Sequence, residues 1–413
     1  MADFHQNGNV VQFHNLRTRT LEEMVYELET FSQNRRITLV LPSLFSELEG
    51  SALKHILDEL SQVSYLNRIV IGLDQATETQ YRMARSFFSQ LPQNHQVLWN
   101  SSPRMDAFWQ RLEQLGIGPV EAGKGKNVWT CLGYLLSCAD TDIMALHDCD
   151  ITTYDREMLA RLVYPLAHPA FPYQLSKGYY PRVDGTRLNG RVTRLLVSPL
   201  LIALKKVVGD RDYIDYLRSF RYPLSGEFAL RAPFLPDIRI PSDWGLEIGV
   251  LSEAWRSMAP QAVCQVEIAD FYDHKHQPVS PEDAAQGLNR MSVDICKAIF
   301  RKLAADGTVF SPNVFRTLKA TYYRRALDMV ETYEHDAKMN GLTLDRHAEE
   351  KSIELFADNI MHAGQVFLET PHESPFIPNW SRVNAADPGI MSELNALVRA
   401  DEDEYSPLPF KTA

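Results

Sequence analysis

The amino-terminal part of this chain alternates short β-rich runs with helical segments. The β-rich runs are residues 36–41, 68–73, 96–99 and 142–147. Helical patterns lie between them, and the last of these, residues 127–138, leads directly into the fourth run. This alternation predicts an α/β fold with a mostly parallel sheet and right-handed crossovers. In such folds ligands bind at the carboxyl ends of the strands, so the residues after each run are candidates for a site.

Two carboxylates, Asp148 and Asp150, follow the fourth run. Side chains two apart on a regular strand point to the same face but start about 7 Å apart, so we expect both carboxylates to reach one ion only where the strand has ended in a turn. Hard oxygen ligands of this kind suit Mg²⁺ or Mn²⁺, which leave positions open for the phosphates of a substrate. The alternative is an acidic pair that ends the strand or caps the following helix.

The composition predicts an ordinary globular protein of 413 residues with 45% hydrophobic residues. A formal net charge of −11 argues against a nucleic-acid binder, although a local basic pocket for a phosphorylated substrate remains open. Five scattered cysteines lack the paired spacing of a zinc site and fit reduced thiols in a cytoplasm. The longest apolar run, residues 195–204, is too short to span a bilayer, so we expect no membrane association.

Basic side chains flanked by glycine could bind anions at two places. Lys124 lies between Gly123 and Gly125 just before a helix, where backbone N–H groups and an ammonium can approach an anion, although a solvated turn is the alternative. Further along, residues 182–193 carry Arg182, Arg187 and Arg191 among glycines. Guanidinium groups match carboxylate or phosphate oxygens, and the alternative is a loop with surface arginines.

Two later segments place an acid beside glycine and an aromatic residue, as sugar sites commonly do. They end at Glu227 and include Glu247, whose carboxylates could accept hydrogen bonds from vicinal hydroxyls. His274 follows a strand-like run at residues 263–268 and could supply a nitrogen ligand to the same cation. The alternative is an exposed histidine without a role.

The order of these motifs resembles one known family. The motifs are Pro42-Ser43-Leu44, Gly123-Lys124-Gly125, Asp148-x-Asp150, residues 177–180, residues 190–193, residues 223–227, residues 245–249 and His274. Together, over residues 36–280, they resemble the retaining glucosyl-3-phosphoglycerate synthases, which are GT-A-fold (Rossmann-like) glycosyltransferases related to mannosyl-3-phosphoglycerate synthases. The resemblance implies that the α/β sheet is of the GT-A type.

The resemblance also implies roles for individual residues. It places Pro42, Ser43, Leu44, Glu47, Lys124, Asp148, Leu224, Ser225, Gly226 and Glu247 at the nucleotide sugar, and Lys177, Gly190, Arg191 and Thr193 at the acceptor. It implies that Asp150 and His274 ligate Mg²⁺ or Mn²⁺. Asp148 and Glu247 are the acids implied at the reacting centre, and we expect Glu247 to position the sugar in preference to acting as a nucleophile.

The expected reaction is retaining transfer of glucose from a nucleotide sugar to 3-phospho-D-glycerate. UDP-glucose is favoured as donor, with GDP-glucose and GDP-mannose as alternatives, and free D-glycerate or mannosyl transfer also stays open. One alternative is a nucleotidyltransferase on the same scaffold, which would need similar metal ligands. A non-catalytic subunit that binds a nucleotide sugar is the remaining alternative.

Three regions are expected along the chain. Residues 1–35 form an amino-terminal arm and a helix, residues 36–290 form the nucleotide-sugar and acceptor domain, and residues 291–413 form a helical carboxyl-terminal extension. Apolar residues at helical spacing predict three long helices at residues 291–305, 312–339 and 344–367. We expect these helices to pack on the domain and form a homodimer, and the tail from residue 371 to be extended.

Overall fold

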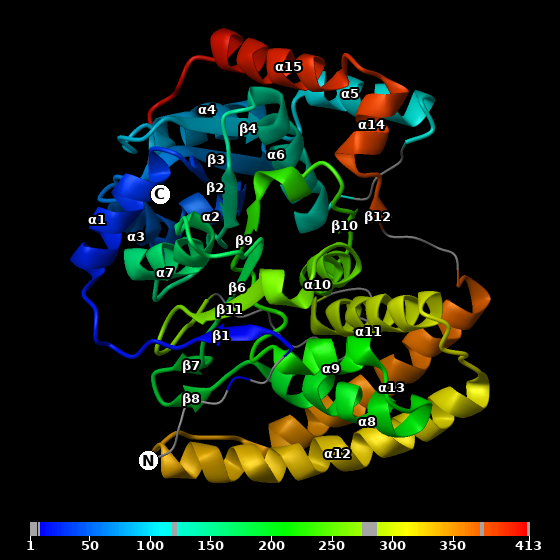
Figure 1. Cartoon of the computed structure of the whole chain (residues 1–413). Coiled ribbons are helices and arrows are strands. Elements are labelled where there is room, and N and C mark those ends of the chain that lie inside the picture. Colours follow the sequence, from blue (N-terminus) through cyan, green and yellow to red (C-terminus); the bar gives the residue numbers. More distant parts are fainter. Residues whose placement is uncertain (1–5, 7–8, 118–121, 275–286, 372–375, 411–413) are drawn as a thin grey trace.

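The computed structural model describes residues 6, 9–117, 122–274, 287–371 and 376–410. Eight strands form its main sheet (Figure 1): β1 (Val11–Phe13), β2 (Ile37–Leu44), β3 (Leu66–Asp74), β4 (His95–Trp99), β5 (Ile143–Leu146), β6 (Leu175–Tyr179), β9 (Phe228–Arg231) and β11 (Val263–Glu267). Their order across the sheet is β1-β11-β6-β9-β5-β2-β3-β4. All neighbours run parallel except β9, which is antiparallel to β5 and β6. The predicted α/β fold with a mostly parallel sheet is confirmed.

Helices cover both faces of this sheet (Figure 1). They are α1 (Leu21–Ser32), α2 (Phe45–Leu48), α3 (Ser51–Leu60), α4 (Glu78–Phe88), α5 (Pro103–Gln114), α6 (Lys124–Cys138), α7 (Arg156–Ala167), α8 (Ser198–Val208), α9 (Asp212–Ser219), α10 (Leu246–Ser257), α11 (Gly287–Ala305), α12 (Pro312–Met339), α13 (Arg346–Glu369), α14 (Trp380–Ala386) and α15 (Ile390–Glu404). Alternate side chains of β2 enter two cores: Val40 packs on the side of α6, whereas Leu39 and Leu41 pack on the side of α3 and α7.

Short elements complete the fold. They are the hairpin of β7 (Val183–Asp184) and β8 (Arg187–Leu188), the pair of β10 (Ile240–Pro241) and β12 (Phe376–Ile377), a π-helical turn at Val192–Val197, and 3₁₀ turns at Ala232–Phe234 and Pro260–Ala262. None of the helices in the described part of the chain combines the length and apolarity needed to cross a bilayer.

The first predicted strand and helix differ from the structure. β2 continues through Pro42-Ser43-Leu44, because these residues keep their parallel register with β3 as far as Leu44 opposite Asp74. The helical pattern between the first two β-rich runs forms two helices, because Gly50 interrupts it and caps α3 in an extended conformation. The strand β9 was not expected from the sequence; its four residues are too few to show a period.

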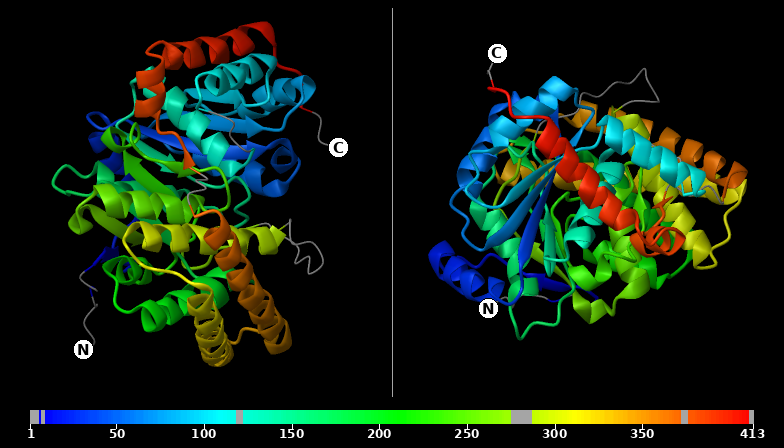
Figure 2. Two further views of the ribbon diagram at one scale, coloured as in Figure 1. Left: turned by 90° about the vertical axis from the view of Figure 1, so that its right-hand side faces the viewer. Right: turned by 90° about the horizontal axis from the view of Figure 1, so that it is seen from above.

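Both ends of the chain are more ordered than predicted where the structure describes them. Within the amino-terminal arm, β1 adds an edge strand beside β11. The tail was expected to be extended, but it forms α14 and α15, and α15 lies across α5 and α6 (Figure 2). The reason is apolar burial: Trp380 stacks on Trp129 of α6 at 4.0 Å between ring centroids, and Leu394 is fully buried.

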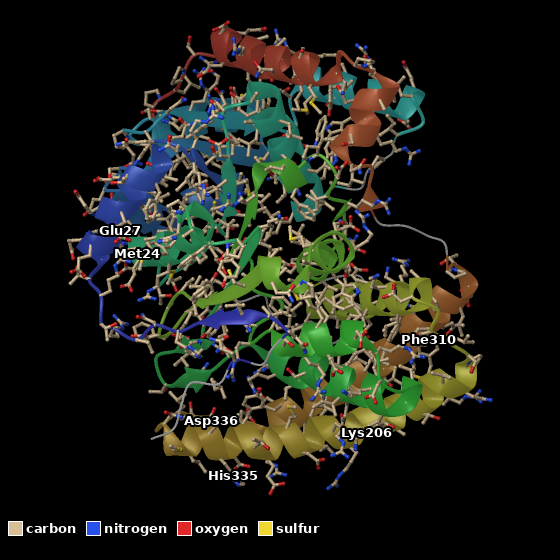
Figure 3. All side chains as sticks on the ribbon, in the orientation of Figure 1. Met24, Glu27, Lys206, Phe310, His335 and Asp336 are labelled. Carbon is tan, nitrogen blue, oxygen red and sulfur yellow. The ribbon has the colours of Figure 1, made fainter. Side chains whose placement is uncertain are left out.

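The three long helices of the extension pack together at the opposite end of the molecule from α15 (Figure 1). Phe310, labelled in Figure 3, lies in the connection from α11 to α12. It stacks on Phe315 with 5.2 Å between ring centroids. On α12, Tyr322 donates its hydroxyl proton to the carbonyl of Leu195 at 2.6 Å. The extension is thereby joined to the segment that follows β8.

Candidate active site

The Asp148 and Asp150 carboxylates lie just beyond the carboxyl end of β5, where the strand has ended and the chain turns. This turn meets the condition under which both can approach one ion. The residue before them, His147, is fully buried, and burial lowers its pKa to about 3. His147 is therefore neutral at physiological pH, because burial disfavours its charged form.

Lys124 joins two acids of the predicted site. Its ammonium lies 2.6 Å from Asp148 Oδ1 and 3.2 Å from Glu247 Oε1. Burial would raise the pKa of Asp148, but the Lys124 ammonium more than offsets this, so the Asp148 pKa lies below its usual value. Burial alone would likewise lower the pKa of Lys124, whereas Asp148 and Glu247 raise it above its usual value. Asp148 and Lys124 are therefore both charged at neutral pH.

The glycines around Lys124 act in packing. Gly125, in the first turn of α6, lies so close to β10 that an added β-carbon would be 1.9 Å from the carbonyl oxygen of Pro241. A side chain at position 125 would push the start of α6 away from β10. The glycine therefore fixes the place where Lys124 enters the site.

Asp150 and His274 approach each other from two connections. His274 Nδ1 lies 3.4 Å from Asp150 Oδ2, and residue 274 forms an antiparallel bridge with Ile151. Among the described residues, no three His, Cys, Asp or Glu side chains are grouped so as to hold a metal ion. A carboxylate oxygen and an imidazole nitrogen at this spacing nevertheless suit two neighbouring ligands of one cation. Mg²⁺ commonly takes its remaining ligands from water and substrate phosphates.

The loop of Leu224, Ser225 and Gly226 lies directly over the Asp148 carboxylate. An added β-carbon at Gly226 would be 2.3 Å from Asp148 Oδ2. From below, the fully buried Lys177 donates a hydrogen bond to the carbonyl of Ser225. Lys177 therefore supports this loop, here called the sugar loop because its residues are predicted to contact the sugar. Lys177 is not among the residues that line the pocket of Gly190 and Arg191, and its contact with the acceptor stays a prediction.

The segment predicted to bind the acceptor borders a pocket of about 770 Å³. Gly190 has a φ of +78°, a conformation that favours glycine, and it turns the chain out of β8. Arg191 lines the pocket, together with Arg182 and Arg187. Thr193 is buried in the π-helical turn, and its hydroxyl has no hydrogen-bond partner among the described residues.

This pocket joins the separate parts of the predicted site. Its lining includes Arg191 from the acceptor segment, Leu224 from the sugar loop and His274 from the predicted cation pair. The end of β2, with Ser43 and Leu44, lies on the strand next to β5. Glu47 follows in α2. The sequence motifs, which are up to about 230 residues apart, thus meet along one edge of the sheet.

Two acids of the site region have partners that the sequence does not reveal. Glu227 is fully buried and accepts hydrogen bonds from the hydroxyls of Tyr180 at 2.5 Å and Tyr272 at 2.8 Å. Burial and the nearby Asp148 charge raise its pKa, and the two hydroxyls oppose that rise. The second acid is Glu349 on α13, which comes more than 150 residues after the arginines that it contacts. No local pattern could have found it.

No protein-family model matches the chain. It is 45% identical over 406 residues to the glucosyl-3-phosphoglycerate synthase of Persephonella marina, an alignment that covers 98% of this chain and 100% of that protein. The chain belongs to the glucosyl-3-phosphoglycerate synthase family. The synthase of Methanococcoides burtonii is 34% identical over 389 residues, which cover 93% of this chain and 95% of that protein.

Solved structures of the family share the fold. The glucosyl-3-phosphoglycerate synthase of Mycobacterium tuberculosis, in complex with Mn²⁺, UDP-glucose and phosphoglyceric acid, aligns with a TM-score of 0.53 at 23% identity. The alignment covers 71% of this chain and 88% of that chain. A complex of the same protein with Mg²⁺ and UDP aligns with a TM-score of 0.51. The predicted resemblance to this family is confirmed. These alignments leave a larger share of this chain unmatched than of the mycobacterial chain.

Proposed function

We propose that this chain transfers the glucosyl group of UDP-glucose to 3-phospho-D-glycerate and so forms glucosyl-3-phosphoglycerate. Family membership over nearly the whole chain supports the reaction. The structural observation that carries the proposal is a pocket bordered by Arg191, Leu224 and His274, where residues predicted to bind the acceptor, the sugar and the cation lie together. An enzyme that joins two substrates needs such a shared space.

On the donor side, the proposed contacts follow the edge of the sheet. Pro42, Ser43, Leu44 and Glu47 would hold the uracil and ribose. Lys124 would lie in the nucleotide pocket, and Asp148 would lie on the ribose and metal side. The loop of Leu224, Ser225 and Gly226, together with Glu247, would hold the glucosyl group. The position of Gly226 against Asp148 supports this arrangement, because it brings the loop and the nucleotide side together.

Asp150 and His274 would hold a divalent cation, Mg²⁺ or Mn²⁺. When bound, such a cation would neutralise negative charge on the leaving diphosphate. On the acceptor side, Gly190, Arg191 and Thr193 would bind the phosphate and carboxylate of 3-phosphoglycerate. Arginine lining the pocket supports this assignment because its donors match both anionic groups.

In the proposed transfer, an acceptor hydroxyl oxygen forms a bond to the anomeric carbon. The bond between that carbon and the diphosphate oxygen breaks, and its electron pair leaves with UDP. The hydroxyl proton passes to the departing diphosphate, so attack and departure occur on the same face and the configuration is retained. Glu247 is paired with Lys124 at 3.2 Å, which favours a positioning role over nucleophilic attack because the pairing lowers the reactivity of the carboxylate.

The test is nucleoside diphosphate release by purified protein with Mg²⁺ or Mn²⁺. UDP-glucose, GDP-glucose and GDP-mannose are each supplied with 3-phospho-D-glycerate or D-glycerate. We expect release only with UDP-glucose and 3-phosphoglycerate, its loss with a chelator, and its loss in Asp150→Ala. The exposed Asp106 of α5 provides a control, Asp106→Ala, which should keep wild-type activity. Activity with another pair, or pyrophosphate release from a sugar phosphate and a nucleoside triphosphate, would contradict the proposal.

We also propose a cytoplasmic, homodimeric protein. All five cysteines are free thiols in the structure, which supports a reducing compartment. Size-exclusion chromatography with light scattering should give twice the chain mass, and a monomer mass at micromolar concentration would contradict the dimer.

A further inference from the structure

The carboxyl-terminal extension borders the pocket that the acceptor segment lines. The connection from α12 to α13 contributes Thr343, Leu344 and Asp345 to its lining, and α13 contributes Glu349. This connection is fixed to the hairpin of β7 and β8, because the backbone N–H of Thr343 donates to the carbonyl of Thr186 at 2.6 Å. The extension is therefore one wall of the pocket.

In the described part of this wall, Glu349 is the carboxylate that contacts Arg191, the predicted acceptor arginine. It is 2% exposed, and its oxygens accept hydrogen bonds from Arg194 at 2.8 and 3.2 Å. One of these oxygens also accepts from Nε of Arg191 at 3.2 Å. Two guanidinium groups thus share one carboxylate, which leaves one net positive charge at the side of the pocket.

Arg194 fixes this carboxylate in place. Its guanidinium donates to the carbonyl of Asn189 at 2.7 Å and lies 4.8 Å from the ring centroid of Tyr333 on α12. Arg194 is 6% exposed, so it is not available to a ligand. The partly exposed Arg191 is held through Nε, the inner edge of its guanidinium. Its outer edge is the part that can meet a phosphate or carboxylate.

We propose that the carboxyl-terminal extension supplies Glu349 as the positioning residue that holds Arg191 for the acceptor. Binding an anion with a flexible arginine costs the conformational entropy of that side chain, and Glu349 removes most of this cost before the acceptor arrives. The inference rests on the proposed function, because it assigns a residue to the same acceptor site. It also gives the extension a role in substrate binding in addition to packing.

The test compares Glu349→Gln with Glu350→Gln. Glu350 is the next residue of α13 and pairs with Arg346 at 2.8 Å outside the pocket, so it matches the substitution without touching the site. In Glu349→Gln we expect the KM for 3-phosphoglycerate to rise at least tenfold, while the KM for UDP-glucose and the Kd for UDP stay within twofold. In Glu350→Gln all three constants should stay within twofold of wild type.

The sign of the change separates positioning from charge. Removing the carboxylate also makes the pocket more positive, which by itself would lower the KM for an anionic acceptor. An unchanged or lower KM for 3-phosphoglycerate in Glu349→Gln would therefore overturn the proposal. Inactive wild-type protein would instead refute the proposed function, so the two failures are distinct.

A second variant covers the case in which Glu349→Gln does not fold. Glu349→Asp keeps the charge but withdraws the carboxylate by one methylene, so we expect an intermediate rise in the KM for 3-phosphoglycerate with an unchanged KM for UDP-glucose. A KM for the acceptor within twofold of wild type in Glu349→Asp would count against a positioning role.

Discussion

Substitution of Gly226 by alanine tests how tightly the sugar loop is packed on Asp148. The added β-carbon would be 2.3 Å from Asp148 Oδ2 and 2.8 Å from its Cγ. The carboxylate would have to retreat by about 1 Å to reach ordinary contact at 3.4 Å. Such a movement disturbs the ion pair with Lys124, whose atoms are now 2.6 Å apart.

A displacement of about 1 Å among reacting groups costs about 100-fold in rate, or about 2.7 kcal/mol of transition-state stabilisation. We therefore expect kcat/KM for UDP release to fall about 100-fold in Gly226→Ala, with a loss of about 1–3 kcal/mol in the free energy of unfolding from overpacking. Both are measured on one preparation, by a coupled UDP assay and by urea denaturation.

The control is Gly389→Ala at the start of α15, where the nearest atom to an added β-carbon is an ordinary 3.5 Å away. It should match wild type in activity. If Gly226→Ala folds normally and keeps kcat/KM within threefold of wild type, the loop does not position Asp148 and the reasoning is refuted.

Two further predictions concern stability. Burial lowers the pKa of Lys177 to about 8, although the charges of Glu247 and Glu227 act in the opposite direction. Between about pH 8 and the ordinary pKa of 10.5, the unfolded chain therefore holds a proton that the folded chain lacks. In that window the free energy of unfolding of wild type, measured by urea denaturation, should rise by up to about 1.4 kcal/mol per pH unit relative to that of Lys177→Met. If the two proteins show parallel dependences on pH, the prediction is wrong. Trp380→Ala should lower the free energy of unfolding by about 3–5 kcal/mol in the same assay, because Trp380 stacks on Trp129 and is 1% exposed. A loss below about 1 kcal/mol would show that this contact does not hold α14.

Local patterns were enough to predict the sheet and to single out the candidate residues that lie at its carboxyl edge. The strand–helix alternation before Asp148 indicated a parallel sheet because crossovers of that length leave few other topologies. A turn after β5 was expected so that two carboxylates could approach one ion, and the structure has it. The bounds of α12 agree with the predicted residues 312–339 because a long apolar period is the strongest local signal.

Elsewhere the local signals were misleading or absent. Proline and serine after residue 41 indicated the end of a strand, but parallel pairing with β3 extends β2 to Leu44. The scattered prolines and acidic run of the tail suggested an extended segment, whereas burial of Trp380 and Leu394 against α6 and its neighbours stabilises helices there. Tertiary burial outweighs weak local preferences in both cases.

The sequence by itself determined the fold class, the family and the residues that meet at the edge of the sheet, because strand period, turn residues and motif order are properties of neighbours along the chain. Only the tertiary structure decided how these side chains pair. The chain fold brings Lys124 between Asp148 and Glu247, places Lys177 beneath the sugar loop, and carries Glu349 to Arg191 across 158 positions. Ion pairs and buried hydrogen bonds act over a few ångströms, and separation along the sequence does not predict which charges come that close.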